Sequence, residues 1–395
     1  MDAIKIQNLD VVFGDQPQKA LSLLDEGKAR QEIIDQTGQV VGVDNVTMSV
    51  KEGEICVLMG LSGSGKSSLL RAVNGLNSIS RGSLQIKDGD NQVELSSCNE
   101  ETLRHLRTHR VSMVFQKFAL MPWLTVLDNV AFGLEMQGMP KAERRAKARE
   151  QLEMVELSDW EHKYPHELSG GMQQRVGLAR AFAMDTDILL MDEPFSALDP
   201  LIRAQLQDEL IQLQKKLNKT ILFVSHDLDE ALKIGNNIAI MESGKLIQHG
   251  KPEQIVLSPE NDYVKDFVSH TNPLNVLKGR SLMQPASELE QEDARWQICP
   301  MQKVWVEERN NQLHLDNKAD LKLVDWRDDE IELSDIDKES VVIASPDIGM
   351  REAIKLKQRS GQPILLVENG ELIGVLDDSD FYAGLLGKHH KPQAA

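Results

Sequence analysis

"MGLSGSGKSSLL", residues 59–70, sets three glycines and four serines beside one lysine, directly after the apolar run "ICVLM". The apolar run predicts a short buried strand, and "KSSLLRAVNGL" predicts a helix because its apolar residues recur at helical spacing. Glycines in the turn between them let backbone N–H groups converge on one point at the positive end of the helix. This segment therefore predicts an α/β fold with an anion-binding turn between a strand and a helix.

The spacing within this turn points to a nucleoside triphosphate. Residues 60–67 follow the pattern G-x-x-x-x-G-K-S, in which the lysine reaches the β- and γ-phosphates and the serine hydroxyl ligates Mg²⁺. The alternative is a flexible turn of glycine and serine without a ligand. We predict an ATP site that includes Gly60, Leu61, Ser62, Gly63, Ser64, Gly65, Lys66, Ser67 and Ser68.

A second segment fits the same chemistry. "DILLMDEPFSALD", residues 187–199, begins with an apolar strand that ends in Asp192 and Glu193. Asp192 is suited to hold Mg²⁺ through water, and Glu193 is placed to polarise an attacking water. The alternative is an ordinary strand followed by an acidic helix start, where carboxylates favour the helix dipole.

"LSGGMQQRVGLARAF", residues 168–182, is a second candidate anion site. Ser169, Gly170 and Gly171 open a helix with a hydroxyl cap followed by bare backbone. Taken alone, a plain helix cap explains these residues equally well.

Together these segments resemble the ATP-binding subunits of ABC transporters. "VFQ", which ends at Gln116, and "VSHD", which contains His226, complete the family's motif order over residues 1 to about 270. The resemblance implies a P-loop ABC cassette at 1–271, with a mixed-sheet core and a helical subdomain at about 100–187.

The resemblance also implies a role for individual residues. Glu193 and His226 would be catalytic, and Phe13 would stack on adenine, although Phe13 as an ordinary core residue is the alternative. The implied Mg²⁺ ligands are Ser67, Gln116 and Asp192.

In this family the phosphate loop and "LSGGM" of one subunit lie far apart, so two subunits complete each site. The resemblance therefore implies a homodimer that encloses two ATP molecules. The residues that would reach the ATP held by the other subunit are Ser169, Gly170, Gly171, Gln173 and Asp199.

An insert at 15–39, with two short amphipathic helices expected around Gly27, resembles one branch of importers. That branch takes up glycine betaine, choline and related quaternary ammonium osmolytes, and the segments at 118–138 and 196–210 resemble it too. It implies a peripheral ATPase at the cytoplasmic face of the membrane, transmembrane permease subunits and, indirectly, a periplasmic or extracellular substrate-binding protein. The permease would dock near Phe118, Leu120, Met121 and Trp123, for which helical-subdomain core is the alternative.

Composition excludes some other functions. The net charge is −18, and the segments on either side of residue 271 are both acidic, so nucleic acid is not an expected partner. No export signal is apparent, and no apolar run approaches the roughly 20 residues that a spanning helix needs. A soluble, non-transport ABC ATPase is the main alternative function, and an exporter cassette is a weaker one.

Beyond the cassette we expect a linker at 272–283 and a regulatory region at 284–395. "KVWVEE" and "QLHLD" predict a hairpin around "RNN". Residues at about 338–388 resemble one CBS repeat, which implies a C-terminal α+β domain that is smaller than the cassette. The alternative to a regulatory role for this domain is an inert dimer scaffold. Asp377 stands where many such repeats place a phosphate-binding hydroxyl, and Asp380 stands at the position that binds ribose. Because a carboxylate repels a phosphate, we expect Asp377 to oppose nucleotide binding.

Overall fold

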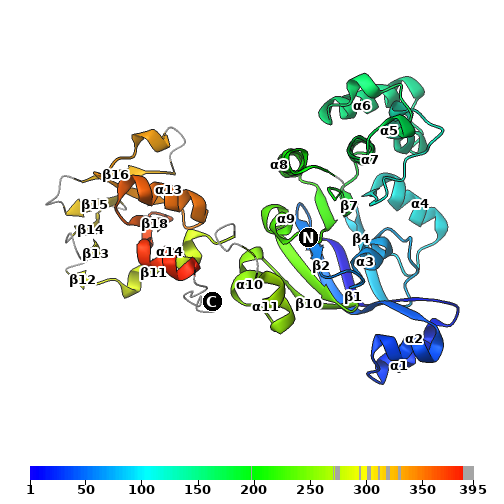
Figure 1. Cartoon of the computed structure of the whole chain (residues 1–395), viewed down its shortest axis with the longest axis horizontal. Helices are drawn as coiled ribbons and strands as arrows, with labels where there is room; N and C mark the ends of the chain where they lie inside the picture. Colours follow the sequence, from blue (N-terminus) through cyan, green and yellow to red (C-terminus); the bar gives the residue numbers. More distant parts are fainter. Residues whose placement is uncertain are drawn as a thin grey trace. The chain divides into compact units, whose positions relative to one another are not determined.

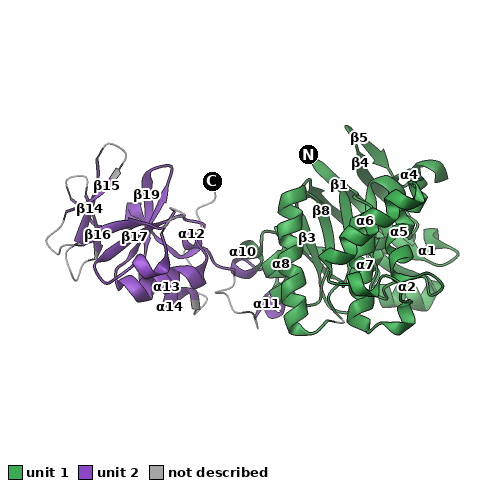
Figure 2. Ribbon diagram, turned by 90° about the horizontal axis from the view of Figure 1, so that it is seen from above, with its two compact units in different colours: residues 1–255, 260–264 green, residues 256–259, 265–395 purple. Residues whose placement is uncertain are grey.

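The computed structural model describes residues 1–196, 198–269, 271, 276–292, 295–299, 304–309, 312–316, 321–327 and 331–385. They form two compact units, drawn in green and purple in Figure 2. Unit 1 comprises Met1–Ile255 and Glu260–Val264, and the rest belongs to unit 2. The division falls within the helices α10 (Pro252–Leu257) and α11 (Asp262–Val268). The domain limits expected from the sequence stay predictions.

A six-stranded sheet forms the centre of unit 1, in the order β10-β9-β3-β8-β7-β6. Its members are β3 (Ile55–Met59), β6 (Val111–Val114), β7 (Ile188–Asp192), β8 (Thr220–Val224), β9 (Asn237–Glu242) and β10 (Lys245–Gly250). All neighbours are parallel except β9 and β10. Every residue of β3, β7 and β8 is buried, which confirms the two buried strands predicted from apolar runs. The carboxyl ends of these strands meet at one edge.

An antiparallel sheet in the order β2-β1-β4-β5 packs on the helix that follows the phosphate loop, α3 (Lys66–Val73). Its strands are β1 (Asp2–Phe13), β2 (Val40–Lys51), β4 (Arg81–Asp88) and β5 (Asn91–Glu94). The insert between β1 and β2 forms α1 (Pro17–Asp25) and α2 (Arg30–Thr37), drawn in blue in Figure 1, which confirms the two expected helices.

Three helices of unit 1 pack on one another around a separate apolar cluster, and they lie together in Figure 1. They are α5 (Val126–Met136), α6 (Lys141–Met154) and α7 (Gly170–Ala183). The remaining helices of this unit are α4 (Glu100–His109), η1 (Ser158–Trp160), η2 (Pro165–Glu167), α8 (Pro200–Leu217) and α9 (Leu228–Ile234).

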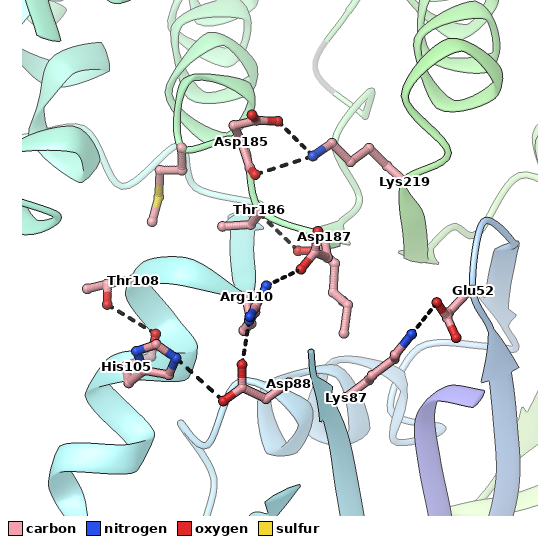
Figure 3. A network of polar contacts seen from close by, with 12 residues as sticks. Glu52, Lys87, Asp88, His105, Thr108, Arg110, Asp185, Thr186, Asp187 and Lys219 are labelled. Atoms are coloured by element: carbon pink, nitrogen blue, oxygen red, sulfur yellow. Dashed lines mark hydrogen bonds and ion pairs between the residues drawn. The ribbon is translucent and has the colours of Figure 1, made fainter. Parts of the chain in front are cut away.

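A polar network fixes the amino-terminal ends of the parallel strands, at the edge opposite to the phosphate loop. Arg110, just before β6, donates to Asp88 through Nε at 2.5 Å and to Asp187 through Nη1 at 2.8 Å. Figure 3 shows Arg110 between these two carboxylates, with the pair of Lys219 and Asp185 nearby. Because Asp88 ends β4 and Asp187 precedes β7, Arg110 ties the two sheets together.

Unit 2 contains a five-stranded sheet in the order β11-β19-β18-β17-β16. The strands of this sheet are β11 (Gln284–Pro285), β16 (Lys322–Asp325), β17 (Ser340–Ala344), β18 (Ile364–Glu368) and β19 (Glu371–Leu376). The helices along this part of the chain are α12 (Gly279–Leu282), η4 (Ala286–Glu288), η5 (Leu333–Asp335), α13 (Met350–Ser360) and α14 (Asp378–Leu385). The order strand, helix, strand, strand, helix from β17 to α14 follows the expected one. Whether it is a CBS repeat stays a prediction, and its expected last residues, 386–388, lie outside the described residues.

The second sheet of unit 2 is β12-β13-β14-β15, formed by β12 (Gln291–Glu292), β13 (Arg295–Cys299), β14 (Val304–Arg309) and β15 (Gln312–Asp316). β14 and β15 pair antiparallel, which confirms the two expected hairpin strands. Residues 310 and 311, where the sequence predicts the turn, lie outside the described residues, as do 272–275 of the expected linker. Within the part of the chain that the structure describes, no helix is both long enough and apolar enough to cross a bilayer.

Candidate active site

The turn between β3 and α3 requires its glycines. Gly60, Gly63 and Gly65 have φ angles of +139°, +78° and +100°, a backbone conformation that residues with a side chain rarely adopt. A Cβ on Gly60 would lie 2.1 Å from the carbonyl oxygen of Met241, and one on Gly65 would lie 2.4 Å from that of Gly42. Conformation and space therefore both exclude side chains at Gly60 and Gly65, and the bare backbone is left free to face a ligand.

Lys66 is buried and folds back over its own loop. Its Nζ donates to the carbonyl oxygens of Gly60 at 2.8 Å and Leu61 at 2.9 Å. Burial lowers the pKa of Lys66, and the nearby carboxylates of Glu193 and Asp192 oppose that shift. Since the hydrogen-bond acceptors are neutral, an anionic phosphate would be a stronger partner for the ammonium group.

Asp192, at the end of β7, is 1% exposed and lies against the start of α3. Its Oδ1 accepts from the hydroxyl of Ser67 at 2.8 Å, and its Oδ2 accepts from Arg71 at 3.2 Å. A hydroxyl and a carboxylate side by side supply the oxygen ligands that Mg²⁺ prefers. Two of the three predicted metal ligands thus lie together.

Glu193 is the meeting point of three loops that follow parallel strands. Its Oε2 accepts from Nε2 of Gln116 at 2.9 Å and lies 3.5 Å from Nδ1 of His226. The backbone φ angle of Glu193 is +49°, which is unusual for a residue other than glycine. Its backbone N–H donates to the carbonyl oxygen of Val224 in β8. The structure therefore brings the two predicted catalytic residues into contact. Gln116 contacts Glu193 here, and its metal role stays a prediction.

Phe13 ends β1 beside the same helix start. A Cβ on Gly42 would lie 2.5 Å from Cε2 of Phe13 and 3.2 Å from Oγ of Ser68, so the ring lies near the first turn of α3. Phe13 is 39% exposed, which leaves part of its ring free for stacking and argues against a purely core position.

The comparisons with known proteins agree with this geometry. A family model described as "ABC transporter" matches residues 43–196. The glycine betaine/carnitine transport ATP-binding protein GbuA of Listeria monocytogenes is 42% identical over 396 residues, which cover 98% of each chain. This chain belongs to the ATP-binding subunits of ABC transporters.

Other similar proteins match about two thirds of this chain. The glycine betaine/proline betaine transport ATP-binding protein ProV of Escherichia coli is 51% identical over 264 residues, 67% of this chain and 65% of ProV. A dimeric ATP-binding cassette solved in a post-hydrolysis state with ADP and Pi is 31% identical, with a TM-score of 0.55, and the match covers 63% of this chain and 98% of that chain. The fold is accordingly the expected P-loop ABC cassette.

The segment "LSGGM", residues 168–172, lies at the start of α7. Ser169 caps this helix by accepting from the N–H of Met172 at 3.3 Å, and Gln173 donates to the carbonyl oxygens of Pro165 and Leu168. Asp199 caps α8 in the same way. Among the described residues, no hydrogen bond joins these side chains, Gly170 or Gly171 to the phosphate loop of the same chain. Their predicted action on a second copy stays a prediction.

The expected permease-docking segment divides into exposed and packed residues. Trp123 is 72% exposed, whereas Leu120 packs on the apolar cluster of α5, α6 and α7. Phe118 and Met121 are half-buried. Trp123 is therefore the best candidate for an apolar contact with a partner, and core packing explains Leu120.

Sequence reasoning missed the residues that hold this segment in shape. Arg180 of α7 donates to the carbonyl oxygens of Phe118 and Ala119, and burial lowers its pKa. Asn129 of α5 is fully buried, and its Nδ2 donates to three carbonyl oxygens at 121, 124 and 125. A buried asparagine and an arginine within helical patterns carry no motif, so only the fold identifies them.

In unit 2, Asp377 has a cationic partner that sequence reasoning also missed. Nζ of Lys357, a residue 9% exposed, lies 2.6 Å from Oδ1 of Asp377. Asp380 accepts from the N–H of Asp377 at 2.7 Å. The ammonium group of Lys357 offsets the negative charge of Asp377, which was expected to repel a phosphate. Whether Asp377 opposes nucleotide binding stays a prediction to be tested.

Proposed function

We propose that this chain is the ATP-hydrolysing subunit of an importer for quaternary ammonium osmolytes such as glycine betaine, proline betaine or choline. The contact of Glu193 with Gln116 and His226, next to Lys66 and Asp192, carries the proposal. The relatives bear the names of glycine betaine, proline betaine and carnitine transport proteins, which favours an importer over a non-transport ATPase. Choline rests on resemblance alone.

In this proposal Ser67 and Asp192 would hold Mg²⁺, which fits their adjacent oxygen atoms. When bound, Mg²⁺ neutralises charge on the β- and γ-phosphates. Arg71 orients the carboxylate of Asp192 by pairing with its second oxygen at 3.2 Å. Lys66 exchanges its carbonyl acceptors for phosphate oxygens, because a charged acceptor forms the stronger hydrogen bond.

Glu193 orients and deprotonates the attacking water through its carboxylate. Gln116 and His226 both lie against Oε2 of that carboxylate, so they position it while Oε1 remains for the water. His226 is exposed in the single chain, which leaves its ring free to meet the γ-phosphate. Since Gln116 lies only two residues before Phe118, a change at Glu193 would also reach the segment around Phe118.

Two copies of the chain complete the reaction site. Ser169, Gly170 and Gly171 open α7 with backbone N–H groups suited to a phosphate. Among the described residues of one chain, no hydrogen bond joins them to the phosphate loop. A second copy facing the first would place this helix start over the γ-phosphate. ATP then holds the pair closed, and hydrolysis lets it open.

The closing and opening of this dimer would drive uptake through separate permease subunits at the cytoplasmic face of the membrane. A substrate-binding protein on the other side would choose the osmolyte with an aromatic cage for its quaternary ammonium group. Unit 2 would regulate the cycle, with Lys357 and Asp377 as one fixed charge pair of the CBS-like repeat.

Reconstitution tests this function directly. The chain is combined with its permease and binding protein in liposomes, and uptake of labelled glycine betaine, proline betaine, choline and carnitine is measured with ATP on the cytoplasmic side. We expect ATP-dependent uptake of at least one of these compounds, and none with Glu193→Gln. ATP hydrolysis without uptake of any of them, in a complex that assembles, would contradict the proposal.

A further inference from the structure

Arg30 opens α2 of the insert and reaches the phosphate loop. Its Nη1 donates to the carbonyl oxygen of Gly63 at 3.2 Å, and its Nη2 donates to that of Val41 in β2. The guanidinium group therefore bridges β2 and the glycine-rich turn. The same strand, β2, pairs with Phe13 of β1. No motif in the sequence assigns a role to this arginine.

The insert that carries Arg30 is firmly seated. Arg81 of β4 donates through Nη1 to both carboxylate oxygens of Asp25, at 2.8 and 2.9 Å, and through Nε to Asp10 at 2.6 Å. A small apolar cluster joins the insert to the flanking strands, and its buried members are Val12, Ala20, Leu21, Ile33 and Val41. The backbone on which Arg30 stands is thus fixed before any ligand arrives, which lowers the entropy lost on binding.

Among the described residues, no carboxylate accepts a hydrogen bond from the guanidinium group of Arg30. Both acceptors are neutral carbonyls, and they use two of the five N–H donors of the guanidinium. Burial lowers the pKa of Arg30, and the charge of Asp44 opposes that shift. A half-buried cation with neutral partners and spare donors is a favourable partner for an anion.

We propose that Arg30 is a further nucleotide-binding residue, which the insert supplies in cis and which contacts a phosphate group of ATP held by the loop at 60–68. The proposal rests on the proposed function, since it requires ATP in this loop. One N–H of Arg30 keeps the Gly63 peptide oriented while the spare donors bind the phosphate. The insert thereby adds a second cation beside Lys66.

The test compares Arg30→Gln and Arg30→Lys with Lys28→Gln in the full chain. Lys28 is an exposed cation in the same insert, so its variant controls for the loss of a nearby charge. Dissociation constants for ATP and ADP are measured by calorimetry over a range of salt concentrations, together with the unfolding temperature without nucleotide. We expect Arg30→Gln to weaken both nucleotides about tenfold, with a shallower salt dependence, and Lys28→Gln to change neither. Arg30→Lys should recover part of the loss because it retains the charge.

Three results would overturn the inference. The first is an ATP affinity of Arg30→Gln within twofold of the unmodified chain. The second is a loss with unchanged salt dependence, which would assign Arg30 to loop geometry alone. The third is an equal loss in Lys28→Gln, which would indicate a general charge effect. Failure of the unmodified chain to bind ATP would instead contradict the proposed function, so the two failures are distinguishable.

Discussion

The carboxylate of Glu193 accepts a hydrogen bond of 2.9 Å from the side-chain amide of Gln116. The two residues are 77 positions apart, and each follows the carboxyl end of a parallel strand, β7 and β6, which are neighbours in the sheet. This contact joins the residue proposed to activate water with the segment proposed to face the permease.

Glu193→Gln should retain ATP binding and lose hydrolysis. The amide keeps the shape of the side chain but cannot take a proton from water, so we expect kcat to fall about a hundredfold or more. ATP that is bound but not hydrolysed should hold two copies together, which size-exclusion chromatography with ATP would show as a stable dimer. Hydrolysis at the normal rate would remove Glu193 from its catalytic role.

Two defective variants should complement each other if each site uses two copies. Lys66→Ala removes the cation of the phosphate loop, and Ser169→Arg blocks the helix start that would face the other copy's ATP. A heterodimer of the two variants contains one site with both elements intact. We therefore expect the mixture to hydrolyse ATP when each variant alone does not. A mixture as inactive as its components, although heterodimers form, would argue against shared sites.

Trp123→Asp should separate hydrolysis from transport. Trp123 is 72% exposed and lies outside the contacts of Glu193, so ATPase activity of the isolated chain should stay within about twofold of normal. Transport by the reconstituted complex should fall strongly, because a charge would disrupt an apolar contact with the permease. Trp160→Asp is a matched control, since Trp160 is also partly exposed, in η1. Equal transport by the two variants would make the docking assignment wrong.

The sequence predicts the parts of the site that depend on local pattern. The positive φ angles of the glycines in the phosphate loop are a local property of the backbone, so a pattern over 60–67 is enough to predict these glycines. The contact of Gln116 with Glu193 depends on which strands become neighbours, which no local segment encodes. Arg30 and Arg71 resemble any helical arginine in sequence, and only the tertiary fold shows that one reaches Gly63 and the other Asp192.

The network around Arg110 should make stability depend on pH. Although burial raises the pKa of Asp88, the hydrogen bond and charge of Arg110 lower it below the ordinary aspartate value. A carboxylate with a depressed pKa stabilises the fold above its ordinary pKa, and this contribution is lost as the pH falls through the depressed value. Arg110→Gln should therefore lower the free energy of unfolding by about 0.5–1 kcal/mol at neutral pH, as for a solvent-accessible ion pair.

The difference in the free energy of unfolding between Arg110→Gln and the unmodified chain should shrink in acid, because protonation of Asp88 removes the charge that Arg110 pairs with. Urea unfolding measured from neutral pH to about pH 3 checks this, because Asp88 begins to take up a proton in that range. Arg144→Gln is a suitable control: Arg144 pairs with Glu135 at 3.0 Å in the helical part of unit 1, far from Asp88 in sequence. A destabilisation by Arg110→Gln that is constant with pH would show that its packing, rather than its charge on Asp88, joins the two sheets.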